Sequence, residues 1–237
     1  ERFGSRNPKA QMMRFHTQTA GSTLTAQQVD NNVVRVTLQA LAAVMGGTQS
    51  LHTNGKDEAL ALPTEASARL ALRTQQVIAS ESGVADFVDP LGGSWAVEKL
   101  TDELEESAMT LIARIDELGG MVSAIEQGFP QREIQNAAYR TQLAQDAGEL
   151  EVVGVNLHRE EEASTPEILR VSAEVEAGQI AKLQKFRTLR DQDTVLRQLD
   201  ALSVAARGTD NLMPVIMDCL GAGASLGEIM LWPLYMR

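Results

Sequence analysis

The chain has 237 residues, of which 43% are hydrophobic, 22% charged and 4% aromatic, a composition typical of a soluble globular protein with an aliphatic core. Its formal net charge of −11 disfavours nucleic acid as a partner, because phosphate binding needs clustered Lys and Arg. The single cysteine, Cys219, excludes an internal disulfide framework and fits a reducing cytoplasm. The most apolar region, 212–236, is interrupted by Asp218 and Glu228. We therefore expect a cytoplasmic protein that binds neither nucleic acid nor a membrane.

Two stretches near the N-terminus are unusually polar for strands: RFHTQTAG at 14–21 and TQSLHTN at 48–54. Successive side chains of a strand alternate between its faces, so each stretch gathers polar side chains on one face. These are Arg14, His16 and Gln18 in the first stretch, and Thr48, Ser50, His52 and Asn54 in the second. Core strands of α/β proteins are normally runs of Val, Ile and Leu. Two polar strands therefore predict a wet interior that holds a polar ligand.

Apolar periodicity predicts a helix after each of these strands, over 25–45 and over 64–80. The inward-facing residues are predicted to be Val34, Leu38, Leu41 and Met45 in the first helix, and Leu70, Val77 and Ile78 in the second. A third short strand is expected over 85–88. This alternation of strand and helix favours an α/β fold with a parallel sheet or barrel.

The rest of the chain is predicted to be mostly helical. Helices are expected over 94–118, 121–127, 131–147, 173–190, 192–206 and 210–220. A short extra strand is possible at 151–155, and the acidic stretch His158–Thr165 is the best candidate for a linker. Ser225 and Glu228 have the spacing of a capping box, which predicts the start of a last helix.

Several familiar catalytic motifs are absent from the sequence: no P-loop, CxxC, HExxH or GxSxG pattern occurs. His16 and His52, with Asp57 and Glu58 nearby, could in principle ligate a metal. Histidines on neighbouring strands more often bind a carbonyl, a ligand or water, so we expect no metal. Cys219 lies in an apolar helical run and is expected to be buried and inert.

Three polar residues remain open to two interpretations. Asn54 and Glu58 follow a strand, where active sites of (β/α)8 barrels are built, but they could equally cap a turn and a helix N-terminus. Arg14 is expected on a buried strand, where its guanidinium needs an anion or several acceptors. It would therefore form an internal ion pair or face an anionic ligand.

The order and spacing of several segments resemble the adenosylcobalamin-dependent acyl-CoA mutases, the family of methylmalonyl-CoA mutase and isobutyryl-CoA mutase. The segments are RFHTQTAG, LTAQQ with NNVVR, GGTQSLHTN with DEALALPT, ARLALRTQQ and DPLGGS. The resemblance implies that residues 1–157 form the C-terminal part of an acyl-CoA-binding (β/α)8 TIM barrel. Residues 158–237 would then form a linker and a helical extension.

The resemblance also implies a reaction, a cofactor and partners. Members of the family isomerise the carbon skeleton of a short-chain acyl-CoA by radical chemistry that adenosylcobalamin supplies. A cobalamin-binding domain or small subunit and the remaining half of the barrel would be partners, in a dimer or heterotetramer. The alternative is a non-catalytic remnant or interaction module that kept the mutase scaffold.

Roles for individual residues follow from the resemblance position by position. Gln18 and Gly21 match family residues that lie against the corrin and the substrate. Asn54 and Glu58 match family residues that reach the adenosyl group, and Ala61 matches a residue in close contact with the corrin. The substrate residues would be Arg14 and His16 in the channel, with Lys9, Gln49 and Ser50 as candidates for contact with CoA or its pantetheine arm.

The sequence departs from the family pattern at Ser22, at Val29–Asp30 and in the final residues LWPLYMR. The first barrel strands, with their histidine and the residues that select the acyl group, are not found in this sequence, nor is the DxHxxG motif of the cobalamin domain. We therefore assign no catalytic residue and expect a fragment of a longer protein, inactive as this chain alone.

Overall fold

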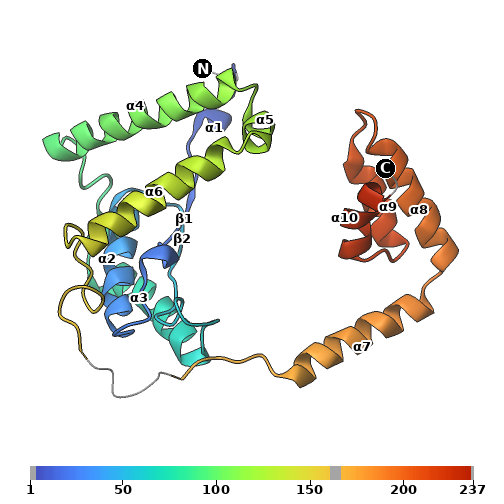
Figure 1. Cartoon of the computed structure of the whole chain (residues 1–237). Coiled ribbons are helices and arrows are strands. Elements are labelled where there is room, and N and C mark those ends of the chain that lie inside the picture. Colours follow the sequence, from blue (N-terminus) through green and yellow to red (C-terminus); the bar gives the residue numbers. More distant parts are fainter. Residues whose placement is uncertain (1–3, 161–166, 236–237) are drawn as a thin grey trace. The chain divides into compact units, whose positions relative to one another are not determined.

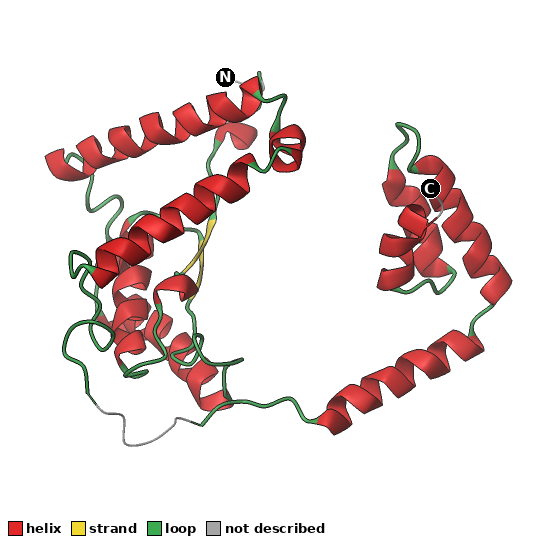
Figure 2. Cartoon of the chain, viewed as in Figure 1, coloured by secondary structure: helices red, strands yellow, loops and turns green. Residues whose placement is uncertain are grey.

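The structure is a computed structural model that describes residues 4–160 and 167–235. The chain forms two compact units, Glu1–Arg170 and Val171–Arg237. The described residues are mostly helical, with one two-stranded parallel sheet in the first unit (Figures 1 and 2). The mixed α/β class predicted from the sequence is thus confirmed.

The first unit is built on one parallel strand–helix–strand unit. Strand β1 (His16–Gln18) is followed by helix α2 (Asn31–Met45) and strand β2 (Ser50–His52). His16 pairs with Ser50 and Gln18 with His52 in the parallel register. Each strand has three residues, fewer than the sequence predicted, although Thr19 N–H also donates to the His52 carbonyl at 3.0 Å.

Helix α2 buries a different face from the one that its apolar periodicity predicted. Asn32, Val36 and Ala40 are buried, whereas Val34 and Leu38 are 61% and 62% exposed. Small and medium side chains on the buried face let α2 pack closely on α3 (Glu65–Glu81), and the larger apolar residues remain outside that contact.

Helix α3 also packs through small residues, because its buried positions are Ser67, Ala71, Thr74 and Ile78. Thr64 caps its N-terminus by accepting a hydrogen bond from Ser67 N–H at 3.2 Å. Of the three residues predicted to face inward, Ile78 is buried, but Leu70 and Val77 are 39% and 48% exposed.

The predicted third strand is wrong. Residues Val84–Asp86 form a 3-10 turn (η2), and Phe87 and Val88 are 72% and 98% exposed. A strand needs a hydrogen-bonded neighbour, and the sheet of the described residues consists only of β1 and β2.

Three helices complete the first unit (Figure 2): α4 (Trp95–Glu117), α5 (Met121–Glu126) and α6 (Phe129–Asp146). Their bounds agree closely with the sequence-based prediction. The apolar stripe of α4 contacts little in this chain, since none of its residues is buried and Leu104 is 62% exposed. The short strand considered at 151–155 is reduced to one bridge between Val153 and Leu157.

The described residues of the second unit form four helices. No helix in 4–160 or 167–235 is long and apolar enough to cross a membrane. The four helices of this unit are α7 (Ala173–Leu189), α8 (Gln192–Ala205), α9 (Leu212–Gly221) and α10 (Leu226–Tyr235). The core joins α8, α9 and α10 through Val195, Leu199, Leu202, Cys219, Ala224 and Ile229. Cys219 is fully buried, as predicted. Residues 161–165 of the predicted linker lie outside the described residues.

An ion pair ties the end of α7 to α10. Arg190 donates to both carboxylate oxygens of Glu228, at 2.7 and 2.6 Å, and to the Gly223 carbonyl at 2.9 Å. Glu228 also accepts from Ser225 N–H at 2.8 Å, so the predicted pairing at this helix start is confirmed. The Arg190 hydrogen bonds lower the pKa of Glu228 to about 2, and the carboxylate in turn raises the pKa of Arg190.

Candidate functional site

The loops after β1 and β2 meet through a buried pair of polar residues. Thr19 and Asn54 are 5% and 3% exposed. Thr19 Oγ1 donates to Asn54 Oδ1 at 3.1 Å and accepts from Asn54 N–H at 2.9 Å, while Gln18 Nε2 donates to the same Oδ1 at 3.2 Å. Since carboxyl ends of parallel strands meet at one edge of a sheet, these contacts fix both loops at that edge.

The side-chain nitrogen of Asn54 has no hydrogen-bond partner in the described part of the chain, although it is buried. Two donors already contact Oδ1, which fixes the amide orientation and leaves Nδ2 as the free donor. An unsatisfied buried donor costs about 1–3 kcal/mol, so its presence at a loop junction needs an explanation. An acceptor atom of a ligand would satisfy it.

Gly21 allows the first loop to approach Asn54 and Glu58 closely. A Cβ atom at Gly21 would lie 2.7 Å from Asn54 Nδ2 and 3.0 Å from Glu58 Oε1. Glycine is needed here for space. The structure therefore brings together Gln18, Gly21, Asn54 and Glu58, four of the five residues that the resemblance placed at the cofactor.

Asp57 anchors the second loop. It is 3% exposed, and its carboxylate accepts from Ser67 Oγ at 2.6 Å and from Thr64 N–H at 3.0 Å. A Cβ atom at Gly55 would lie 2.7 Å from both Asp57 Oδ1 and Ser67 Oγ, so the loop is tightly folded against the start of α3. No group of three or more His, Cys, Asp or Glu residues suited to a metal occurs in the described ranges.

Asn32 is a further residue of the site region to which the sequence analysis gave no role. It is fully buried at the start of α2 and contacts both Thr25 and the Lys56 carbonyl. A signal was available, because Asn32 shares the i, i+4, i+8 face of Val36 and Ala40. A polar residue on such a face must find buried hydrogen-bond partners.

A second polar pair lies on the strands themselves. His16 Nδ1 and Ser50 Oγ are 2.7 Å apart across the paired strands, and both side chains are exposed. Gln49 is held by the backbone, since its side-chain oxygen accepts from Phe15 N–H at 2.7 Å and its nitrogen donates to the Gly47 carbonyl at 2.8 Å. His16 and Ser50 are thus accessible side chains, whereas both ends of the Gln49 amide are bound by backbone groups.

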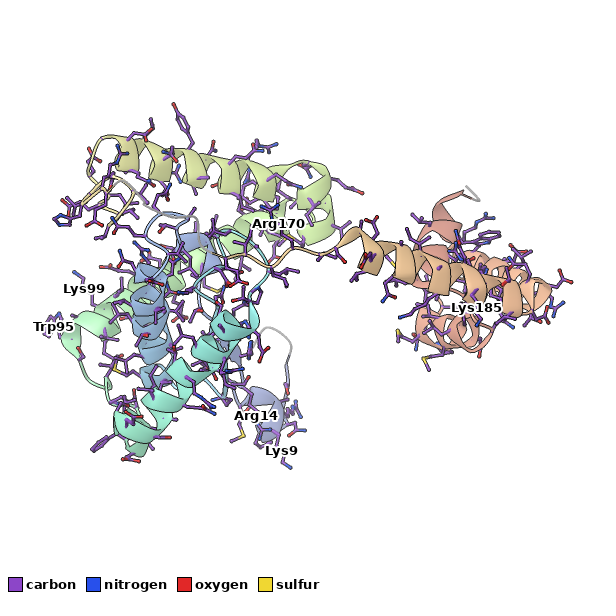
Figure 3. The ribbon with its side chains drawn as sticks, turned by 90° about the horizontal axis from the view of Figure 1, so that it is seen from below. Lys9, Arg14, Trp95, Lys99, Arg170 and Lys185 are labelled. Carbon is purple, nitrogen blue, oxygen red and sulfur yellow. The ribbon has the colours of Figure 1, made fainter. Side chains whose placement is uncertain are left out.

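Three predicted site residues lie outside these clusters. The expectation that Arg14 is buried is wrong: it precedes β1 and is exposed, because the sheet has only two strands in the described residues and no described element covers Arg14. Lys9 is exposed on the short helix α1 (Pro8–Gln11), and Figure 3 shows both cations at the edge of the first unit. Ala61 is half-buried, and its N–H donates to the Asp57 carbonyl at 3.1 Å.

A cavity of about 1060 Å³ opens beside the site. The loop Ser22–Gln27, the exposed side of α2 with Val34 and Leu38, and Ala59 line one part of it. The end of α6 and the segment 150–155 line another part. The cavity adjoins the loops of the site, but Gln18, Asn54 and Glu58 do not line it. The candidate site is therefore the hydrogen-bonded junction of the two loops and not the cavity.

Comparison with known proteins identifies the class. A family model described as methylmalonyl-CoA mutase matches residues 1–232. The chain is 48% identical over 231 residues to the 2-hydroxyisobutanoyl-CoA mutase large subunit of Aquincola tertiaricarbonis, covering 97% of this chain and 41% of that protein. It is 45% identical over 228 residues to methylmalonyl-CoA mutase of Escherichia coli K12, covering 96% of this chain and 32% of that protein.

A third relative is the mitochondrial methylmalonyl-CoA mutase of Bos taurus, to which the chain is 43% identical over 226 residues (94% of this chain, 30% of that protein). All three relatives are named as mutases of CoA thioesters. This chain belongs to the methylmalonyl-CoA mutase family. It spans 41% of the length of the first of these relatives and about a third of the others.

Proposed function

We propose that this chain forms part of the acyl-CoA-binding barrel of an adenosylcobalamin-dependent mutase. The reaction would be carbon-skeleton isomerisation of a short-chain acyl-CoA, of the methylmalonyl-CoA/succinyl-CoA or isobutyryl-CoA/butyryl-CoA type. The observation that carries the proposal is the buried, unpartnered Asn54 Nδ2 at the loop junction. Membership of the family and the parallel β1–α2–β2 unit, the repeat from which (β/α)8 barrels are built, support it.

The residues of the site suit an adenosyl group. Asn54 Nδ2 offers a donor, Glu58 is an exposed carboxylate that can accept from two ribose hydroxyls, and Gly21 lets the first loop approach both side chains closely. Gln18 and Ala61 are proposed to lie against the corrin. When bound, adenosylcobalamin would supply the radical chemistry, while the protein orients the reactants and excludes water.

On the substrate side, we propose that His16 and Ser50 contact the thioester part of the acyl-CoA. When Ser50 Oγ donates to His16 Nδ1, the ring proton lies on Nε2, which can then donate to a carbonyl oxygen. Lys9 and Arg14 are proposed for the anionic part of CoA, since both are exposed cations on the same N-terminal segment. Gln49 would contribute to the pantetheine path.

The proposal includes partners. Residues 1–157 would join the remaining half of the barrel, residues 158–237 would form the linker and helical extension, and a cobalamin-binding domain or small subunit would complete a dimer or heterotetramer. The exposed apolar faces of α2 and α4 support packing against further polypeptide.

Reconstitution tests the proposal. The chain would be combined with the remaining barrel and a cobalamin subunit taken from a relative, with adenosylcobalamin and methylmalonyl-, isobutyryl- or 2-hydroxyisobutanoyl-CoA offered separately. Isomerisation of one ester is expected and would also identify the substrate. Assembly without isomerisation of any ester would overturn the proposal in favour of a non-catalytic interaction module.

A further inference from the structure

Helix α2 begins with a buried amide that joins both loops of the candidate site. Asn32 Nδ2 donates to the Thr25 carbonyl at 2.9 Å and to the Lys56 carbonyl at 2.8 Å, and Asn32 Oδ1 accepts from Thr25 N–H at 3.1 Å. Asn32 has no exposed surface. Every donor and acceptor of this amide is therefore used within the protein, unlike those of Asn54.

The two segments that Asn32 joins are those that carry the site. Thr25 follows Gly21 in the first loop, and Lys56 lies between Asn54 and Glu58 in the second. Only a few residues separate each anchor from the site, so movement at Asn32 would be passed on to the contact between Gly21, Asn54 and Glu58.

Arg35 fixes which way the amide points. Its Nη1 donates to Asn32 Oδ1 at 2.8 Å and its Nη2 donates to the Val153 carbonyl at 2.7 Å. Because Arg35 can only donate, it holds the amide oxygen on its own side. The amide nitrogen then faces the carbonyls of Thr25 and Lys56, and this orientation cannot be reversed without losing four hydrogen bonds.

We propose that Asn32 is a positioning residue that sets the distance between the Gly21 turn and the Asn54–Glu58 segment. It does not touch the ligand; it acts through the backbone of both loops. The geometric part of this proposal stands by itself, whereas its consequence for turnover rests on the proposed mutase function.

The variant Asn32→Asp isolates the positioning contacts. The carboxylate has nearly the same shape and still accepts from Thr25 N–H and Arg35, but it has no hydrogen to donate to the two carbonyls. It would instead repel the carbonyl oxygens of Thr25 and Lys56, so the loops should separate. The matched control is Thr74→Val, which removes a hydrogen bond within α3, from a hydroxyl to the Leu70 carbonyl.

Amide NMR and hydrogen exchange of the full chain test the geometry without any ligand. In Asn32→Asp, the Gly21 amide and Asn54 side-chain signals should shift, and exchange over 20–25 and 53–58 should rise about tenfold, with α3 unchanged. Thr74→Val should change α3 and leave these two loops as they were. Unaltered Gly21 and Asn54 signals in Asn32→Asp would overturn the proposal.

Should Asn32→Asp fail to fold, Asn32→Ser decides the matter, because it places no charge in the interior and a hydroxyl is too short to reach both loops. Faster exchange confined to the two loops would support the proposal. Exchange that rises equally throughout 20–81 would show that Asn32 serves only stability and would overturn it.

In the reconstituted enzyme, Asn32→Ser should lower kcat about tenfold and leave the KM for the acyl-CoA within about twofold. A KM increase alone would contradict the positioning role. If no variant and no wild-type assembly turns over, the mutase proposal fails, while the NMR result still decides the geometry.

Discussion

At the scale of single residues, the candidate site depends on side chains that hold backbone rather than on side chains that meet solvent. Asp57 folds the second loop onto α3, and Thr19 locks it to the first. Glu58 and the side-chain nitrogen of Asn54 do not hold backbone in this way, and both are proposed to contact the adenosyl group. Substitutions at Glu58 and at Gly21 should therefore separate ligand contact from loop geometry.

Replacing Glu58 by Ala should lower kcat of the reconstituted mutase more than it weakens acyl-CoA binding. The reason is that the carboxylate is proposed to hold the adenosyl group and not the CoA ester. Steady-state kinetics would measure both parameters. Glu65→Ala is the matched control, because Glu65 is a glutamate on the outer surface of α3 whose side chain is 88% exposed. Unchanged turnover in Glu58→Ala would refute the adenosyl role.

Replacing Gly21 by Ala should reduce the affinity for adenosylcobalamin by about tenfold, because the new methyl group would meet Asn54 Nδ2 at 2.7 Å and Glu58 Oε1 at 3.0 Å. A spectroscopic titration of the assembled enzyme with the cofactor would measure this. Gly178→Ala, where a Cβ meets nothing within 4 Å, should bind the cofactor normally. Equal affinities in both variants would mean that the close approach at Gly21 has no role in cofactor binding.

Sequence reasoning named most of the residues that meet at the loop junction, for a clear physical reason. Gln18 and Asn54 lie on the polar faces of their predicted strands, Glu58 follows the second strand, and the resemblance added Gly21. Burial was harder to predict. Arg14 was expected to be buried because its strand was expected to be buried. Burial depends on elements that are distant in sequence, and Arg14 is exposed. The position of Asn32 on the face of Val36 and Ala40 indicates burial, but not its role, because most of its partners are backbone groups of Thr25 and Lys56, which no sequence pattern displays.

At the scale of elements, the helices were predictable because their signals are local. Glycines end them, and apolar residues recur along one face; α4, for example, begins and ends within one residue of its predicted bounds. Strands need partners from elsewhere, so the stretch 85–88, apolar but unpaired, formed no strand. The predictions of which helix face is buried were wrong for the same reason: Val34 and Leu38 on α2 were predicted to face inward and are exposed.

The Arg190–Glu228 pair should make the second unit sensitive to acid. The pKa of Glu228 is lowered from 4.5 to about 2 in the folded protein, so the carboxylate stabilises the fold above about pH 4.5. That stabilisation, on the order of 3 kcal/mol at most, is lost as the pH falls from about 4.5 to about 2. Denaturant unfolding followed by Trp232 fluorescence, in a Trp95→Phe background, would measure it.

Glu228→Gln provides the comparison, because it keeps the shape of the side chain and removes its titration. Its stability should be lower than that of wild type at pH 7 and should decline less between pH 4.5 and 2. Parallel pH profiles for the two proteins would contradict the assignment to Glu228.

Leu199→Ala should destabilise the α8–α10 core by about 2–5 kcal/mol, since Leu199 is 1% exposed and its truncation leaves a cavity among Val195, Leu202 and Cys219. The same denaturant experiment measures the loss. Val204→Ala on the same helix, where Val204 is 71% exposed, should cost less than about 0.5 kcal/mol. Similar losses in the two variants would contradict the assigned core.

At the scale of the whole molecule, the chain separates a site-bearing unit from a helical one with its own core. The first unit exposes much apolar surface, above all on α4, whose stripe includes Leu100, Leu104 and Leu111 at 56%, 62% and 49% exposure. Such contiguous surface is characteristic of an interaction face. The proposed assembly with the rest of the mutase would bury it.

Leu104→Glu should therefore weaken that assembly, because a carboxylate would be placed within an apolar interface. Analytical size-exclusion chromatography of the chain mixed with the remaining mutase parts would show less complex. Glu106→Ala, two positions along α4 and on another side of the helix, serves as the control and should assemble as wild type does. Full complex formation by Leu104→Glu would exclude the α4 stripe from the interface.

The tight folding of the loop between β2 and α3 also bears on how such a site can change. Asp57 holds the loop to the start of α3 through Thr64 N–H, which constrains the loop's length. Gly55 constrains its backbone path, because a side chain there would collide with Asp57 and Ser67. Insertions and substitutions there should be poorly tolerated. Ser22 and Gln27 on the opposite loop are exposed and line the cavity. New substrate preferences, in evolution or in a directed library, should therefore arise from the first loop, while the second keeps its form.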